Sequence, residues 1–273
     1  MNPIFGNYFD DLSGRIGTIL DQALEGGFDE AISLMAQCLG NGGVLQAFGT
    51  GHSEAFAMEM AGRVGGFIAT HPIRLVDLVV LGGYPVSMLG SADFERRASV
   101  ADDLWRLYEI HPEDAFLIAS NSGANGATVG LALRARREGH PVIAVTSLEH
   151  SRSVASRHPS GLRLFEIADV VLDNRAPYGD SAIPVGAGPT MGPVSSITAA
   201  FIAQLLTLGT AERLLAQGKP LNVFRSSNIS GGDEHNAALQ GALGRRVNSY
   251  LSQSDQDRCD ADEASDAVDG ARS

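Results

Sequence analysis

The chain has 273 residues, of which 44% are hydrophobic and 6% aromatic, and its formal net charge is −12. A chain of this length can bury one large core, and an acidic chain without a basic stripe is not expected to bind nucleic acid or an anionic membrane surface. Lys219, followed by Pro220, is the only lysine, which excludes a P-loop and confines any Schiff base to that one residue.

Cysteine content and hydropathy further narrow the classes of protein to which the chain can belong. Cys38 and Cys259 are the only cysteines, too few for a disulfide framework. The acidic N-terminus lacks the apolar core of a signal peptide, and no run of 18 apolar residues occurs. We therefore expect a cytoplasmic protein that does not span a membrane. The HxxxH and CxxC spacings are absent, so no metal site is predicted.

In the first half of the chain, apolar spacing and glycine turns mark the elements. We predict helices over 4–24 and 28–40, a strand over 44–48, a helix from Ser53 to about residue 64, and a helix over 92–109. Three short apolar runs between the last two helices, at 67–69, 73–76 and 78–81, are left unpaired.

The second half contains the clearest unit, a strand–loop–helix–strand over 115–146. The predicted elements are strands over 115–119, 141–146 and 170–172, and helices over 128–138, 194–216 and 234 to about 251. Residues 174–193 are predicted to be a long loop. The last 22 residues carry seven acids and two arginines, so we predict one domain over 1–251 and a disordered acidic tail over 252–273.

Alternating strands and helices predict an open, mostly parallel sheet with helices on both faces. Ligands of such sheets bind outside the carboxyl ends of the strands. Two glycine-containing loops follow predicted strands, and we expect both to line one crevice there.

The first loop consists of Gly49, Thr50, Gly51, His52 and Ser53. Glu54 occupies the sixth position of a GxGxxG pattern, which excludes a dinucleotide fingerprint. The loop is either a tight turn or a nest of N–H groups that holds an anion together with the hydroxyls of Thr50 and Ser53. His52 lies inside the loop and is a candidate for a polar contact to that anion.

The second loop consists of Ser120, Asn121, Ser122, Gly123, Ala124 and Asn125. It supplies two hydroxyls, two amides and the N–H groups of a helix start. Such donors suit a phosphate monoester or a sugar hydroxyl, although a purely structural loop is the alternative.

Two further residues are candidates for proton transfer. Glu59 lies among apolar or small residues, and it is either an exposed partner of Arg63 at i,i+4 or a general base in the crevice. Glu54 is expected to complement the helix dipole. His235 follows Asp233, a plausible N-cap, and is either solvated or catalytic.

A histidine- and arginine-rich segment follows the strand over 141–146. His150 and His158 lie near Arg152, Arg157 and Ser160. This segment is either a solvated loop or a second wall of the ligand site.

Several motifs in order resemble the SIS (sugar isomerase) domain, and more narrowly a bacterial family of SIS-domain proteins. They are FGTGHSEAF (48–56), IASNSGANG (118–126), VIAVTSLEHSRSVASRHPSG (142–161), ADVVLDN (168–174) and SNISGGDEHN (227–236). The resemblance covers about residues 5–245.

The resemblance implies a three-layer α/β/α sandwich with a five-stranded, mostly parallel sheet, N-terminal helices and a C-terminal helix. It also implies a homodimer or homotetramer that binds a phosphosugar at the carboxyl ends of the strands. The family's serine loop corresponds to residues 120–123, and Asn125 stands where a threonine is usual. In phosphoheptose isomerases the base lies one turn beyond the position of Glu59, and their metal-binding histidine has no match.

The leading hypothesis is an aldose–ketose sugar-phosphate isomerase without an organic cofactor. Glu59 would be the base and His235, supplied by a partner subunit, the proton shuttle. The phosphate anchor would be formed by Ser53, Ser120, Ser122 and Asn125. The alternatives are a phosphosugar sensor without turnover and a lyase or etherase acting on an amino-sugar phosphate.

Overall fold

The core of the molecule is a five-stranded parallel sheet. The computed structural model describes residues 3–91, 93–248 and 250, so the predicted tail over 252–273 lies outside the described residues. The strands are β1 (Leu45–Gly49), β2 (Thr70–Ile73), β3 (Ala115–Ala119), β4 (Val142–Thr146) and β5 (Val170–Asp173). Their order is β2-β1-β3-β4-β5, and every neighbouring pair is parallel. The inner strands β1, β3 and β4 are buried at every position, as continuous apolar runs predict.

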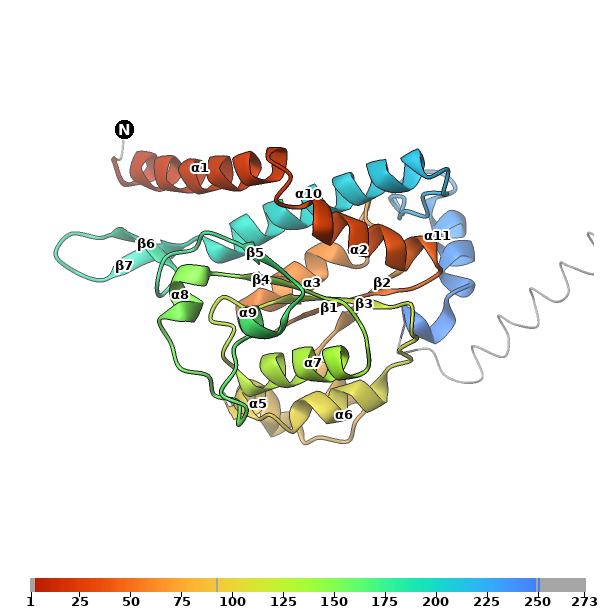
Figure 1. The fold of residues 1–273 in the computed structure, drawn as a ribbon, viewed down its shortest axis with the longest axis horizontal. Coiled ribbons are helices and arrows are strands. Elements are labelled where there is room, and N and C mark those ends of the chain that lie inside the picture. The colour runs from red at the N-terminus through yellow and green to blue at the C-terminus, as the bar shows by residue number, and fades with distance from the viewer. Residues whose placement is uncertain (1–2, 92, 249, 251–273) are drawn as a thin grey trace, which may run out of the picture.

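Helices cover both faces of the sheet, so the predicted three-layer sandwich is confirmed (Figure 1). One face carries α2 (Asp29–Gly40), α3 (Glu54–Met60) and α10 (Ser195–Ala216), with α1 (Pro3–Leu24) packed over α10. The other face carries α4 (Leu75–Val80), α5 (Asp93–Arg96), α6 (Val100–Leu107), α7 (Gly126–Arg137) and α9 (Leu164–Ile167). Each face has its own buried apolar cluster, and the sheet separates the two.

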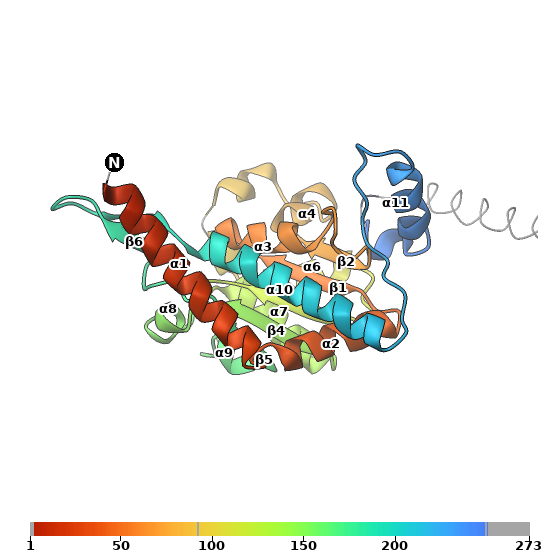
Figure 2. The ribbon, with the colours of Figure 1, turned by 90° about the horizontal axis from the view of Figure 1, so that it is seen from above.

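The remaining elements lie around this sandwich. They are α8 (Leu148–Arg152), α11 (Gly232–Gly241), the antiparallel strands β6 (Ser181–Pro184) and β7 (Thr190–Pro193), and three 3₁₀ turns, η1 (Gly51–Ser53), η2 (Val86–Gly90) and η3 (Gly244–Arg246). Figure 2 shows α1 and α10 running side by side across the sheet. The strand β6 lies near one end of this helix pair, and α11 lies beyond the other end.

Four predicted elements were wrong in part. The loop over 174–193 contains the β6–β7 hairpin. The helix after Ser53 ends at Met60, because Ala61 is extended and Gly62 has φ +71°. The helix over 92–109 is broken into α5 and α6, and the last helix ends at Gly241.

Helix α10 has the length and composition to cross a membrane, with 22 residues and a mean hydropathy of 1.2 over its most apolar window. A core helix of a globular protein passes the same test, and a single such helix is weak evidence. In this fold α10 packs along α1, α2 and α3, and 33% of the window is buried.

A buried polar chain ties together the amino-terminal ends of β1, β2 and β3. His71 Nδ1 lies 3.1 Å from Gln46 Oε1, and Gln46 Nε2 donates to Asp114 Oδ2 at 3.0 Å. Arg246 Nη2 completes the chain by donating to Asp114 Oδ1 at 2.6 Å. His71 is 3% exposed, and this burial lowers its pKa to about 4.

The buried His71 makes stability depend on pH. Its pKa is about 4 in the folded chain and about 6.5 in the unfolded chain, so between these values only the unfolded state binds the proton. The free energy of unfolding should therefore fall as pH drops through this window, by up to about 3 kcal/mol. Urea unfolding of the wild type and His71→Gln across the window checks this, because the variant should lose part of the slope. Equal slopes would contradict it.

Candidate functional site

The two glycine loops lie together at the point where the sheet changes its winding direction. The crossover from β1 to β2 passes through α3 on one face, whereas the crossover from β3 to β4 passes through α7 on the other. The neighbouring strands β1 and β3 thus send their loops to opposite sides, which opens a crevice at their carboxyl ends. The expectation that both loops line one crevice is met by this topology.

The first loop is shaped by Gly49 and Gly51. A Cβ on Gly49 would lie 2.2 Å from the carbonyl oxygen of Ser53, so a side chain cannot be placed there. Gly51 has φ +55°, a conformation that favours glycine. Thr50 is buried, His52 is exposed and Ser53 is half-buried, and Ser53 makes no capping hydrogen bond to α3. The Ser53 hydroxyl is therefore not used as the helix cap.

The second loop is held by its own side chains. Ser120 Oγ accepts from the Gly123 N–H at 3.1 Å, and Ser122 Oγ lies 3.4 Å from the Ala124 nitrogen that donates to it. Thr146 Oγ1, at the end of β4, donates to the Ser120 carbonyl at 2.6 Å. These contacts turn the loop back on itself at the start of α7.

This turn leaves donors free. Within the described residues, the N–H groups of Asn121 and Ser122 have no acceptor. The first N–H groups of α7 also lack partners inside the helix, as at every helix start. Two buried hydroxyls in this region, Thr128 Oγ1 on α7 and Ser151 Oγ behind Gly123, have no hydrogen-bond partner among the described residues. An anion at this helix start would meet several unpaired donors.

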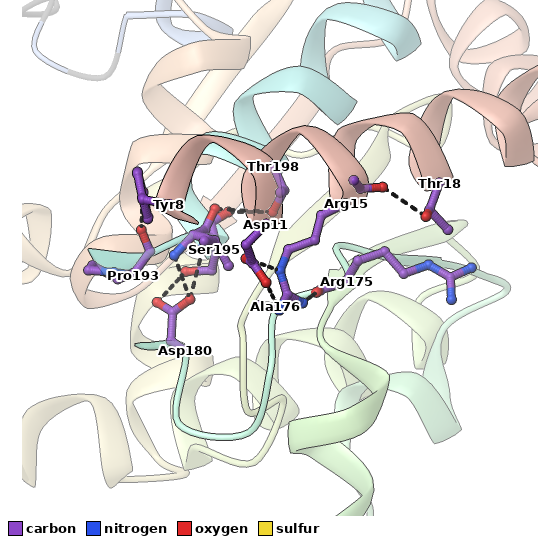
Figure 3. A network of polar contacts seen from close by, with 12 residues as sticks. Tyr8, Asp11, Arg15, Thr18, Arg175, Ala176, Asp180, Pro193, Ser195 and Thr198 are labelled. Atoms are coloured by element: carbon purple, nitrogen blue, oxygen red, sulfur yellow. Dashed lines mark hydrogen bonds and ion pairs between the residues drawn. The ribbon is translucent and has the colours of Figure 1, made fainter. Parts of the chain in front are cut away.

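The start of α10 lines the same crevice through Ser195 and Ser196. A polar network holds this segment in place (Figure 3). Asp180, with φ +70°, accepts from the Ser195 N–H at 2.8 Å and from the Ser195 hydroxyl at 2.7 Å, which caps α10. Helix α1 holds the same segment, because Tyr8 donates to the Pro193 carbonyl at 2.9 Å and Arg15 donates to the Arg175 carbonyl. The N-terminus of α10 is thereby fixed above the two loops.

The cavity enclosed by these segments has a volume of about 10 Å³, which is about enough for one water molecule. Its lining residues are His52, Ser53, Phe56, Ala119, Ser120, Asn121, Val145, Asn174, Ser195, Ser196 and Ala199. A sugar phosphate does not fit inside it, so such a ligand would lie against its rim. Larger cavities lie elsewhere, at the β2 edge (about 180 Å³) and between α1 and α8 (about 840 Å³).

The predicted proton-transfer residues are not brought together in one chain. Glu59 lies on α3 facing α10, where its Oε1 accepts from Gln204 at 2.7 Å and pairs with Arg63. His235 lies on α11, and its Nε2 is 3.0 Å from the Val223 carbonyl oxygen. Helix α11 and the η3 turn that follows it lie near the amino-terminal ends of the strands, since Arg246 binds Gly42 and Asp114. Asp233, the predicted N-cap, lies in the first turn, after Gly231 as N-cap.

Burial raises the pKa of Glu54, the first residue of α3, while Arg74 opposes the shift and Asp77 adds to it. Its Oε1 lies 3.9 Å from Arg74 Nε. From the sequence, Glu54 was expected only to complement the helix dipole. In the structure its carboxylate lies next to the first loop and has a raised pKa, so it is protonated more easily than a solvated one.

Sequence reasoning missed two residues that support the second loop, and it placed a third, Arg157, only in a basic segment that could be a second wall of the ligand site. Asn174, just beyond β5, donates to Asn121 Oδ1 at 3.2 Å, and Ser147, just beyond β4, donates its N–H to the Asn121 carbonyl at 3.3 Å. Arg157 donates to Asn125 Oδ1 at 2.7 Å. Polar residues directly after a buried strand were the signal for the first two, the same signal that marked the serine loop.

Gly123 offers a test of the loop geometry. It has φ +60°, and a Cβ there would lie 2.9 Å from Ser151 Oγ and 3.2 Å from Leu164 Cβ. Gly139 has φ +91° but open space around it. Both substitutions to alanine should incur left-handed strain of about 1–2 kcal/mol, and Gly123→Ala should lose about 1–3 kcal/mol more by overpacking. Urea unfolding of both variants measures the difference, and equal losses would contradict the packing.

Comparison with known proteins places the chain in a family. The model of the SIS domain matches residues 7–147. A UPF0309 protein of Listeria monocytogenes is 35% identical over 244 residues, which cover 89% of this chain and 98% of that protein. A UPF0309 protein of Halalkalibacterium halodurans is 36% identical over 223 residues, which cover 81% and 90% of the two chains.

The fold also has a counterpart among solved structures. A phosphoheptose isomerase from Neisseria gonorrhoeae superposes with a TM-score of 0.51 at 18% identity, over 76% of this chain and 97% of that one. At this identity the likeness concerns the fold alone. The family model and the relatives, in contrast, cover more than half of the sequence, and by them the chain belongs to the SIS-domain family, among the UPF0309 proteins.

Proposed function

We propose that the chain binds the phosphate group of a sugar phosphate at the β1–β3 switch point and isomerises the sugar between aldose and ketose. The observation that supports this most is that Ser53 of the first loop and Ser120 and Asn121 of the second line one small cavity. Beside it, the N–H groups of Asn121 and Ser122 have no acceptor among the described residues. Ser53, Ser120 and Ser122 supply hydroxyls around that point. The phosphate would lie on the loops, and the sugar would extend from the rim of the small cavity.

The isomerisation requires one base that removes a proton next to the carbonyl and returns it to the neighbouring carbon. We assign the base to Glu59, which is half-buried on α3. Its ion pair with Arg63 and its hydrogen bond from Gln204 must open before the carboxylate can reach a substrate. The Arg63 side chain is half-exposed, so it can turn away from Glu59 into solvent without displacing buried groups.

His235 can serve as the shuttle only in a neighbouring copy's site, because in its own chain α11 lies near the amino-terminal ends of the strands, whereas the site lies at their carboxyl ends. We therefore propose a homodimer, which the unpartnered apolar surface of α1 and α10 supports. Phe5, Phe9 and Leu24 are each more than 60% exposed on α1, as are Leu208 and Leu215 on α10. Exposed apolar patches of this kind mark association surfaces.

A sensor without turnover is the second candidate. The observation that favours it is the closed state of Glu59, whose carboxylate is occupied by Arg63 and Gln204. The same base and phosphate loop would also serve a lyase or etherase, which differs in its product and not in the site.

Glu59→Gln separates the enzyme from the sensor. We expect it to retain ligand-induced stabilisation and to slow isomerisation at least about 100-fold, because the base is lost. A thermal-shift screen of sugar phosphates identifies the ligand. A ligand present at 100 times its dissociation constant stabilises the folded chain by about 2.7 kcal/mol. Solvent deuterium exchange at the carbon next to the carbonyl then measures turnover. Glu54→Gln is the control, and loss of exchange in this variant alone would move the base to Glu54.

Leu208→Glu tests the homodimer. Leu208 is 66% exposed in the single chain, and a charge there should disrupt an apolar interface without disturbing the core. We expect sedimentation velocity to show a dimer for the wild type and for Glu212→Gln, an exposed polar control on the same helix, and a monomer for Leu208→Glu. A monomeric wild type that turns over substrate would exclude the proposed role of His235.

A further inference from the structure

The segment after α8 brings an arginine to the second loop. The Arg157 N–H donates to the Ala124 carbonyl at 2.8 Å, which fixes the backbone of residue 157 beside the loop. Its Nη1 donates to Asn125 Oδ1 at 2.7 Å. Asn125 is the N-cap of α7 and is 8% exposed, and its side chain makes no capping bond to the helix. The buried amide therefore holds a guanidinium at the helix start.

The charge of this guanidinium is not compensated. Among the described residues, no carboxylate lies within ion-pair distance of Arg157, and its side-chain partner is a neutral amide oxygen. Arg163, on the same segment, is by contrast paired with Glu166 at 2.9 Å. Arg157 itself is exposed, so its remaining N–H donors are accessible to solvent and to a ligand.

A phosphate monoester needs such a charge here. It carries about −1.5 to −2 at neutral pH, whereas a helix start supplies only about half a positive charge. The chain as a whole has a net charge of −12, so its overall field opposes an anion. Lys219, the only lysine, donates to the Gly40 carbonyl at the amino-terminal edge of the sheet, far along the strands from the loop.

We propose that Arg157 binds the phosphate dianion directly and makes the site select phosphorylated over unphosphorylated sugars. Asn125 is its positioning residue, which holds the guanidinium at the helix start until the ligand arrives. A guanidinium presents a planar fork of donors that matches two phosphate oxygens, which a hydroxyl cannot do. This inference rests on the proposed phosphate site at the second loop.

The test measures the affinity for inorganic phosphate by calorimetry at pH ~8, where the dianion predominates, and at pH ~5, where the monoanion predominates. We expect Arg157→Gln to weaken dianion binding about 10- to 100-fold, the range for a lost charge-assisted hydrogen bond, and to reduce the preference for the dianion. Arg157→Lys, which keeps the charge without the fork, should recover part of the loss. Asn125→Ala should weaken binding less than Arg157→Gln.

Two controls distinguish the failure of this inference from the failure of the site. Arg152→Gln removes another exposed arginine nearby, whose guanidinium lies 5.9 Å from the Phe165 ring centroid, and should leave the affinity unchanged. Ser120→Ala reports on the loop itself. If Ser120→Ala weakens phosphate binding but Arg157→Gln does not, the role of Arg157 is overturned and the site stands. If the wild type binds no phosphate, or Ser120→Ala changes nothing, both are overturned.

Discussion

The order of the parallel strands is the constraint on which the candidate site depends. Because β1 and β3 are neighbours whose crossover helices lie on opposite faces, the loops that follow them diverge and leave a crevice between them. The chain passes from β1 to β2 on one side of this crevice and from β3 to β4 on the other. The glycines, hydroxyls and free N–H groups of the two loops acquire a common target only because the topology places them side by side.

Close backbone contacts hold the loops in their shape. Gly49 has the Ser53 carbonyl where a Cβ would be, and Gly126 has the Arg96 carbonyl in the same place, 2.2 Å away in each case. The break between α5 and α6 puts that carbonyl against α7. The α1 helix and the Asp180 cap in turn fix the start of α10 (Figure 3). A cradle held in this way would bind the proposed anion without first having to order its own backbone.

Local sequence carried enough information for the inner strands, the long helices and both loops, because buried apolar runs and glycine turns are local signals. It missed the β6–β7 hairpin, whose glycines and prolines are typical of a loop, although the antiparallel pairing of Ser181 with Pro193 forms across it. It also could not place His235. That placement depends on contacts far apart in sequence, such as Arg246 with Asp114, which no local pattern contains. Arg157 was noticed as part of a basic segment, but its contact with Asn125 required the fold.

The central claim is that an anion binds where the β1 and β3 loops meet. Amide chemical-shift mapping of the ¹⁵N-labelled chain during titration with inorganic phosphate tests it most directly. We expect saturable shifts concentrated at residues 49–53 and 120–128, with the N–H groups of Asn121 and Ser122 among the most affected. Shifts confined to the cavity at the β2 edge or to the groove between α1 and α8, with the two loops unchanged, would contradict it.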